Sequence, residues 1–115
     1  MELSIIIVNY KSRAKLLNCL DSITKADLKN ISYEIIVVDN ASGDDLSGLS
    51  DSYPLRLIMS PKNLGMGGGN NLGINEARGE YILVLNPDTV VNAAAISELL
   101  NYLKGNAASE IYFKD

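Results

Sequence analysis

Three apolar stretches of this chain end directly in asparagine or aspartate. The stretches are residues 5–8, 35–38 and 82–85, and they are followed by Asn9, Asp39-Asn40 and Asn86-Pro87-Asp88. Apolar runs of this kind without alternation are typical of strands buried on both faces, as in a parallel sheet covered by helices. Ligands of such sheets bind outside the carboxyl ends of the strands. The polar residues therefore stand where a ligand would be held.

Strand and helix patterns alternate along the chain. The expected order is a helix from Ser12, strand 33–38, a loop at 41–52 with at most a short helix, strand 55–59, a glycine-rich turn at 63–71 leading into a helix that Gly79 ends, strand 81–85, and a helix between Asn92 and Gly105. This alternation predicts an α/β fold, with an open, mostly parallel sheet and helices on both faces. The tail, residues 105–115, leaves two alternatives: Ile111-Tyr112-Phe113 begins another strand, or it is an unpaired end.

Length and composition exclude several classes. A chain of 115 residues has room for one domain. Its net charge of -4, with ten scattered basic residues, argues against nucleic-acid binding, which needs clustered lysine and arginine. No apolar run approaches a membrane span, and no charged segment precedes the first strand as in a signal peptide. Without histidine and with Cys19 alone, histidine catalysis, an internal disulfide and most metal clusters are excluded. We therefore expect a cytoplasmic protein.

The glycine cluster Gly65-Met66-Gly67-Gly68-Gly69 allows two interpretations. It resembles a dinucleotide fingerprint, but that fingerprint follows the first strand of its fold, and this cluster follows the third. The alternative is a flexible turn that needs positive φ, although four glycines in five residues exceed what one turn requires. We favour a close approach of the backbone to a ligand.

Asp39 also has two readings. In the turn-forming segment at residues 39–43, an Asx-turn or a cap explains an aspartate well. A carboxylate at the carboxyl end of a strand can instead accept hydrogen bonds from a base or a ribose. Its position beside the other strand ends favours the second reading.

The segment Asn86-Pro87-Asp88-Thr89 gives the most specific indication of a ligand site. Pro87 lacks an N–H and ends strand pairing, so the chain must turn and present Asp88 at the mouth of the sheet. One carboxylate together with substrate phosphates and water is the usual setting of Mg²⁺, and Mn²⁺ takes the same oxygen ligands. The alternative is that Asp88 only caps a turn before the last helix.

Weaker candidates flank these segments. Asn70 and Asn71 stand where an N-cap of the third helix is expected, and a helix N-terminus is also an anion site. Tyr10 and Lys11 follow the first strand, where they could stack on a base or contact phosphate, or be ordinary surface residues.

Five segments taken together are more specific than any one of them. They are residues 4–10, 34–42, 63–73, 77–81 and 85–89, in that order. Their order and spacing closely resemble the nucleotide-binding half of family 2 glycosyltransferases of the GT-A fold, over residues 3–104. The Asn-Tyr, Asp-Asn-Ala-Ser, Gly-Asn-Asn and Asn-Pro-Asp variants look most like the rhamnosyltransferase-like branch.

The resemblance implies transfer of a sugar, with inversion, from a dTDP- or UDP-linked nucleotide-sugar to a saccharide or lipid-linked saccharide. It implies a nucleoside pocket at Asn9 and Tyr10, with Asp39 reaching the base or ribose. It places Asn86 near the ribose, and Asp88 on a divalent metal, Mn²⁺ or Mg²⁺, at the diphosphate. The remaining substrate-binding residues that it implies are Asn40, Gly65, Asn70 and Asn71.

The chain departs from the family pattern in two ways. Asn86 replaces the first acid of the family's Asp-x-Asp motif. The sequence also ends where the acceptor-binding half begins in the family, and inverting members take their general base from that half. We therefore expect a truncated donor-binding domain at residues 1–115, with no general base assigned. An uncovered sheet edge and apolar patch predict a symmetric homodimer.

Two other functional classes are alternatives to a glycosyltransferase. A non-catalytic nucleotide-binding or interaction module could keep this fold without the chemistry. A dinucleotide-dependent oxidoreductase is disfavoured by the position of the glycine cluster. For a transferase acting on a lipid-linked acceptor, a peripheral position at the inner face of the membrane is an alternative to free cytoplasm.

Overall fold

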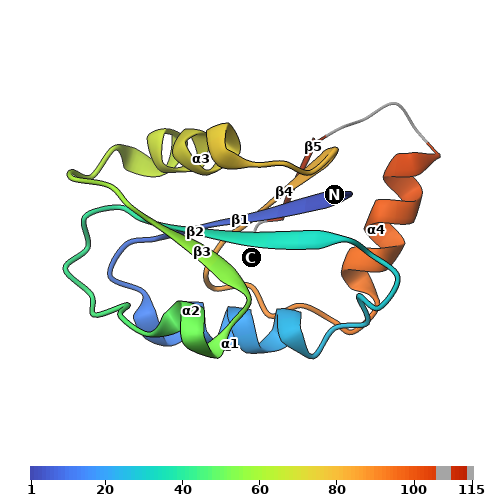
Figure 1. The fold of residues 1–115 in the computed structure, drawn as a ribbon, viewed down its shortest axis with the longest axis horizontal. Coiled ribbons are helices and arrows are strands. Elements are labelled where there is room, and N and C mark those ends of the chain that lie inside the picture. Colours follow the sequence, from blue (N-terminus) through green and yellow to red (C-terminus); the bar gives the residue numbers. More distant parts are fainter. Residues whose placement is uncertain (106–109, 114–115) are drawn as a thin grey trace.

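A computed structural model describes residues 1–105 and 110–113 of the chain. One sheet of five parallel strands, in the order β3-β2-β1-β4-β5, is covered by helices (Figure 1). In chain order the elements are β1 (Leu3–Asn9), α1 (Arg13–Thr24), β2 (Tyr33–Asp39), α2 (Leu49–Ser52), β3 (Leu55–Met59), α3 (Gly65–Glu76), β4 (Tyr81–Leu85), α4 (Ala95–Lys104) and β5 (Glu110–Phe113). The predicted α/β fold, with a parallel sheet and helices on both faces, is confirmed.

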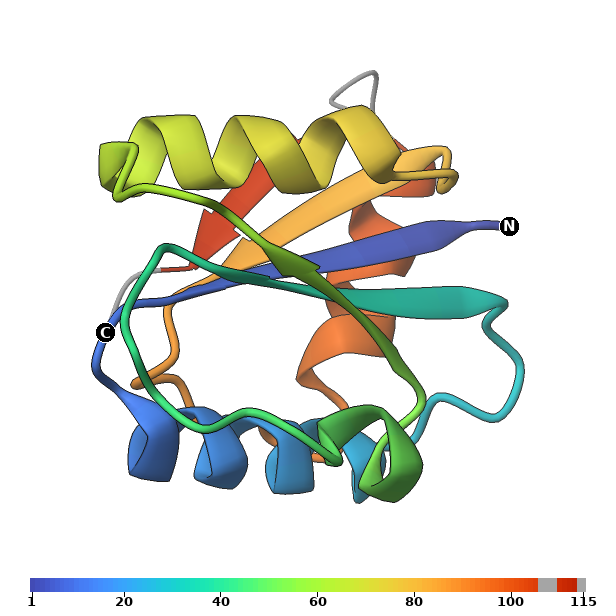
Figure 2. The same ribbon diagram turned by 60° about the vertical axis from the view of Figure 1, so that its left-hand side comes forward.

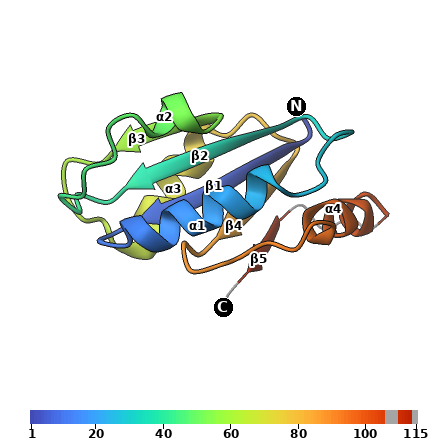
Figure 3. The ribbon, with the colours of Figure 1, turned by 90° about the horizontal axis from the view of Figure 1, so that it is seen from below.

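The helices form two layers. α3 lies across one face of the sheet, and α1 with α2 lies across the other (Figure 2). Seen from below, α1 runs along the sheet (Figure 3). α4 joins the layer of α1 and α2 through Ile96, which is buried in the same core cluster.

The central strand β1 is buried along its whole length. Ile5 and Ile7 belong to the core on the α1 side, and Ile6 and Val8 belong to the core on the α3 side. A strand with apolar contacts on both faces needs no polar alternation, which explains the unbroken apolar run in the sequence.

The tail contributes a fifth strand. β5 runs parallel to β4, with Glu110 opposite Ile82 and Phe113 opposite Leu85. Of the two alternatives for Ile111-Tyr112-Phe113, the strand is therefore the one observed. Residues 106–109 and 114–115 lie outside the described part of the chain.

The glycine-rich segment is helical, and the expectation of a turn at 63–71 was wrong. α3 begins at Gly65, where φ is +74°, and Leu64 occupies the N-cap position. Asn70 and Asn71 lie inside the helix, so neither is the N-cap that the sequence suggested.

Close packing of α3 on the sheet explains two of its glycines. A Cβ atom on Gly73 would lie 2.5 Å from Cγ2 of Ile6, and one on Gly69 would lie 2.8 Å from Cγ1 of Val8. Real Cβ atoms do not approach so closely, so side chains at these positions would push α3 away from β1. Close backbone approach is therefore real here, but the partner is the sheet.

Other expected helix ends are shifted. Ser12 is at the N-cap position of α1, but its side chain makes no capping hydrogen bond. Asn92 does not cap α4, because the N-cap position is Ala94. α3 ends before Gly79, whose Cβ would lie 2.5 Å from the backbone nitrogen of Ser4. Gly79 is thus required by its contact with β1.

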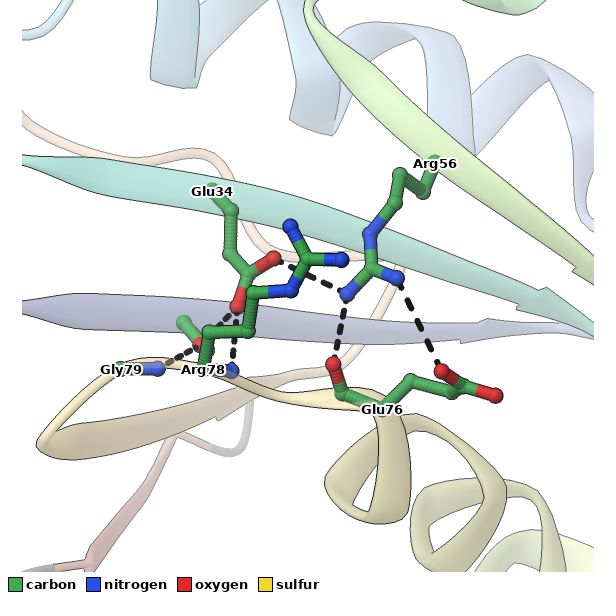
Figure 4. Close-up of polar contacts among 6 residues, drawn as sticks. Glu34, Arg56, Glu76, Arg78 and Gly79 are labelled. Atoms are coloured by element: carbon green, nitrogen blue, oxygen red, sulfur yellow. Dashed lines mark hydrogen bonds and ion pairs between the residues drawn. The ribbon is translucent and has the colours of Figure 1, made fainter. Parts of the chain in front are cut away.

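A polar network ties the amino end of the sheet together (Figure 4). Glu34 accepts hydrogen bonds from Ser4 Oγ, from the Arg78 N–H at 2.7 Å and from Arg56 at 3.0 Å. Arg56 also donates to the backbone carbonyl of Glu76 at 2.6 Å. These contacts join β2, β3 and the segment that leads from α3 to β4.

The network lowers the pKa of Glu34. Burial alone would raise this pKa, but hydrogen bonds from Ser4, the Arg78 N–H and Arg56 outweigh burial and hold it below its ordinary value of 4.5. Folding therefore favours the ionised carboxylate. The resulting stability is present above the ordinary value and is lost as the pH falls through the folded-state pKa.

We expect Gly73→Ala to lower the free energy of unfolding by about 1–3 kcal/mol, because its Cβ overlaps Ile6. Gly67→Ala is the matched control, since a Cβ there meets nothing within 4 Å and alanine favours helix by about 1 kcal/mol. Urea unfolding followed by circular dichroism measures both changes. Equal effects of the two substitutions would contradict the packing role of Gly73.

We expect Glu34→Gln to cost about 1–3 kcal/mol of unfolding free energy at neutral pH, the scale of hydrogen bonds to a charged group. The difference from the wild type should shrink as the pH falls below 4.5. Glu76→Gln is the control, because its ion pair with Arg56 is exposed and 3.7 Å long. Urea titrations across acidic pH test this, and a pH-independent difference would disprove it.

Candidate functional site

A pocket of about 290 Å³ opens at the carboxyl end of the sheet. Its walls come from the ends of β1, β2 and β4 and from the first turns of α1 and α3. The lining residues are Val8, Tyr10, Ser12, Lys15, Asn40, Asn63, Gly65, Met66, Asn86, Pro87 and Asp88. The pocket lies where the sequence predicted that polar residues would gather.

Five of the predicted site residues line this pocket. They are Tyr10, Asn40, Gly65, Asn86 and Asp88. They come from four separate segments of the sequence, which the parallel strands bring to one edge.

The other four predicted residues do not line it. Asn9 and Asp39 are 0% and 1% exposed and lie at the aligned carboxyl ends of β1 and β2. Asn70 and Asn71 lie further along α3. The structure thus separates a buried pair at the strand ends from the residues that form the open pocket.

Asn9 and Asp39 form a buried polar network. Asn9 Nδ2 donates to Asp39 Oδ1 at 3.0 Å and to Asp44 Oδ2 at 3.0 Å. Ser42 Oγ also donates to Asp39 Oδ1, at 2.6 Å. Both Asp39 oxygens therefore hold hydrogen bonds within the protein, since the Ser42 N–H approaches Oδ2 at 3.4 Å. The network fixes the loop after β2 against the end of β1.

Asn40 clamps the start of α3. Its Oδ1 accepts the Leu64 N–H at 2.9 Å, and its Nδ2 donates to the Gly65 carbonyl at 2.9 Å. Asn63 Oδ1 accepts the Gly65 N–H at 2.8 Å. Side chains from outside the helix thus satisfy the N–H groups of Leu64 and Gly65, which have no partner within α3.

The segment after β4 forms a tight turn. Asn86 Oδ1 accepts the Asp88 N–H at 3.0 Å, and the Asn86 carbonyl accepts the Thr89 N–H at 2.9 Å. Pro87 is buried, whereas the Asp88 side chain is 43% exposed and lies 3.3 Å from Lys15 Nζ. The turn therefore holds one carboxylate at the mouth of the pocket, as the sequence predicted.

Backbone strain is concentrated at the same edge. Lys11 and Ala41 have φ of +54° and +58°, a region that residues other than glycine rarely adopt. They directly follow Tyr10 and Asn40. Strained residues of this kind gather at functional sites. Lys11 Nζ also lies 5.2 Å from the centre of the Tyr10 ring, within the range of a cation–π contact.

The donor set at Asp88 suits a hard cation that keeps other ligands. In residues 1–105 and 110–113, no group of three or more His, Cys, Asp or Glu residues could enclose a metal ion. Asp88 offers one exposed carboxylate beside an open pocket. This fits Mg²⁺ or Mn²⁺ bound through one carboxylate, with water and ligand phosphates completing the shell.

Lys15, Asn63 and Met66 line the pocket but were not predicted. A signal for Lys15 was available, because lysine in the first turn of a helix opposes the helix dipole. Asn63 lies just before α3 and Met66 lies in its first turn, so both are carried by the start of that helix. Separately, none of the helices in the described residues is long and apolar enough to span a bilayer.

We expect Asn40→Ala to lower the free energy of unfolding by about 1–3 kcal/mol, because the buried Asn40 side chain loses two hydrogen bonds that hold the start of α3. Asn71→Ala, at an exposed position of the same helix, should change it by less than about 0.5 kcal/mol. Thermal or urea unfolding compares the two variants. A similar loss in both would show that the clamp at Asn40 contributes little.

Comparison with known proteins identifies the family. The family model for glycosyl transferase family 2 matches residues 4–113. The chain is 40% identical over 102 residues to the low-salt glycan biosynthesis hexosyltransferase Agl10 of Haloferax volcanii, covering 85% of this chain and 31% of that protein. It is 30% identical over 112 residues to a poly(ribitol-phosphate) beta-glucosyltransferase of Bacillus spizizenii, covering 92% of this chain and 18% of that protein. The chain therefore spans less than a third of the length of either relative.

Solved structures share the fold. TarS of S. aureus in complex with UDP-GlcNAc aligns with a TM-score of 0.82 at 23% identity, over 93% of this chain and 32% of that one. The mannosyltransferase PcManGT of Pyrobaculum calidifontis, in complex with GDP-Man and Mn²⁺, aligns with a TM-score of 0.77 at 20% identity, over 89% of this chain and 32% of that one. These structures show the fold, and the matched family model together with the 40% identical relative shows that the chain belongs to glycosyl transferase family 2.

Proposed function

We propose that this chain binds the nucleotide-sugar donor of a glycosyltransferase, with a divalent metal, in the pocket at the carboxyl end of the sheet. The observation that carries the proposal is the convergence of Tyr10, Asn86 and Asp88 on one open pocket. Family membership supports it, as do fold neighbours that hold UDP-GlcNAc, or GDP-Man with Mn²⁺.

The nucleoside would lie against the ends of β1 and β2. The Tyr10 ring is 43% exposed at the pocket and can stack on a base. Asn86, which lines the same pocket directly after β4, can face the ribose. Asp39 already holds hydrogen bonds from Asn9 and Ser42, so a direct contact of Asp39 with base or ribose requires the ligand to displace one of them.

Asn40, Gly65, Asn70 and Asn71 would act from α3 and its clamp. Asn40 and Gly65 contribute to the pocket wall and hold the start of the helix. Asn70 and Asn71 are further from the pocket mouth, so their part would be to support the sugar side of a larger bound donor.

Asp88 is the residue that would hold the metal, Mn²⁺ or Mg²⁺. A bound ion would neutralise the charge that develops on the leaving nucleoside diphosphate. The chain's own residues then have simpler tasks. Asp88 anchors the ion, the Asn86-Pro87-Asp88 turn fixes the carboxylate, and Tyr10 orients the nucleoside.

The finer features of the transfer are part of the same proposal. We propose an inverting transfer from a UDP- or dTDP-linked sugar to a saccharide or lipid-linked saccharide, in a rhamnosyltransferase-like enzyme. The relatives named above are a hexosyltransferase and a glucosyltransferase, which supports a hexose as the sugar. A homodimer and a cytoplasmic or membrane-peripheral location complete the proposal, and light scattering and cell fractionation test them.

We expect Asp88→Asn to weaken nucleotide binding in the presence of Mn²⁺ by at least about tenfold, because one charge-assisted contact to the metal is lost. Isothermal titration with UDP, dTDP, GDP and NAD, each with Mn²⁺ or with EDTA, measures this. Asp51→Asn, at an exposed position of α2, is the matched control and should bind like the wild type.

The titration separates the proposal from its alternatives. Metal-dependent binding of a nucleoside diphosphate that requires Asp88 supports a donor site. Binding of NAD in preference to the three nucleoside diphosphates would contradict it, and so would Mn²⁺-dependent binding that survives Asp88→Asn unchanged.

A further inference from the structure

Among the described residues that line the pocket, Lys15 and Asp88 carry the charges, and they pair with each other. Their Nζ and Oδ1 atoms are 3.3 Å apart, and the side chains are 65% and 43% exposed. The carboxylate that would hold a metal is therefore next to a protein cation when no ligand is bound.

The position of Lys15 is not explained by the helix that carries it. α1 begins at Arg13, and its first turn contains no acidic residue. Cations at the amino end of a helix are disfavoured by its dipole. The next residue, Leu16, is fully buried in the core, which fixes this turn of α1 against the sheet. Lys15 is thus held at the pocket wall although the helix gains nothing from its charge.

We propose that Lys15 is an exchangeable counterion of the donor site. Without ligand, Lys15 neutralises Asp88. When a divalent metal occupies Asp88, the ammonium group of Lys15 turns to the diphosphate of the donor. The proposal rests on the donor-binding function given above and adds to it a second, protein-borne cation for the phosphates.

The physical properties of the pair suit such an exchange. An exposed ion pair is weak, so a divalent ion on the carboxylate displaces it readily. A metal ion at Asp88 also repels the ammonium group, which frees it to move. Lysine has a compact charge on a flexible stem and binds phosphate as a point charge, so it can change partner without a movement of the backbone.

If Lys15 exchanges partners in this way, one substitution should strengthen the binding of Mn²⁺ and weaken the binding of pyrophosphate. Lys15→Met removes the competing cation, so Mn²⁺ alone should bind about two- to fivefold more tightly, the range expected for an exposed pair. The same variant should bind inorganic pyrophosphate in the presence of saturating Mn²⁺ more weakly, by about threefold or more, because a cation for the phosphates is lost. Lys15→Arg keeps the charge and should change both affinities less than Lys15→Met does.

Electron paramagnetic resonance of free Mn²⁺ measures the first affinity, and calorimetry with pyrophosphate measures the second. Lys29→Met is the matched control, an exposed lysine between α1 and β2, outside the residues that line the pocket. It should leave both affinities unchanged.

Two results would overturn the proposal: affinities of Lys15→Met that match the wild type, or changes in the same direction for Mn²⁺ and pyrophosphate. Absence of any Mn²⁺ binding to the wild type would overturn it as well. None of these results depends on a nucleoside. Failure of the donor-binding function would appear separately, as pyrophosphate binding without added affinity for UDP, dTDP or GDP.

Discussion

Burial of β1 on both faces is the constraint on which the rest of the structure depends. Ile5 and Ile7 require a layer on one side, and Ile6 and Val8 require a layer on the other. The chain must therefore cross the sheet repeatedly with helices, and every strand points the same way. The carboxyl ends of the strands consequently meet at one edge, where Asn9 and Asp39 bond to each other and Asn86 holds the turn before Asp88.

The two ends of the parallel strands have different roles. At the amino end, Glu34 and Arg56 are occupied with each other and with the backbone near α3, so their polar atoms serve stability. At the carboxyl end, Asn40 holds the start of α3, while Tyr10 and Asp88 face an open pocket. Side chains from outside the helix therefore fix both ends of α3: Asn40, directly after β2, holds its start, and Arg56 of β3 holds its end.

Much of this arrangement could be predicted from the sequence, because strands buried on both faces leave an unambiguous apolar signal. The bounds of β3 and β4 and the turn at Asn86-Pro87-Asp88 follow directly from local composition. The glycine segment could not be predicted, since glycine disfavours helix in isolation, and only packing of Gly69 and Gly73 on β1 reverses that preference. The burial of Asp39 was likewise hidden, because it depends on Asn9, thirty residues away in sequence.

The tight contact between α3 and β1 has a consequence for how the site can adapt. Since Ile6 and Val8 leave no space beneath Gly73 and Gly69, α3 cannot slide or rotate without steric overlap. The part of the pocket wall that α3 forms is therefore held in place, and the adjustable parts are the exposed side chains at the rim, Tyr10, Lys15 and Asp88. Ligand preference could therefore diverge among related chains by substitutions at the rim alone, with the fold and its stability left intact.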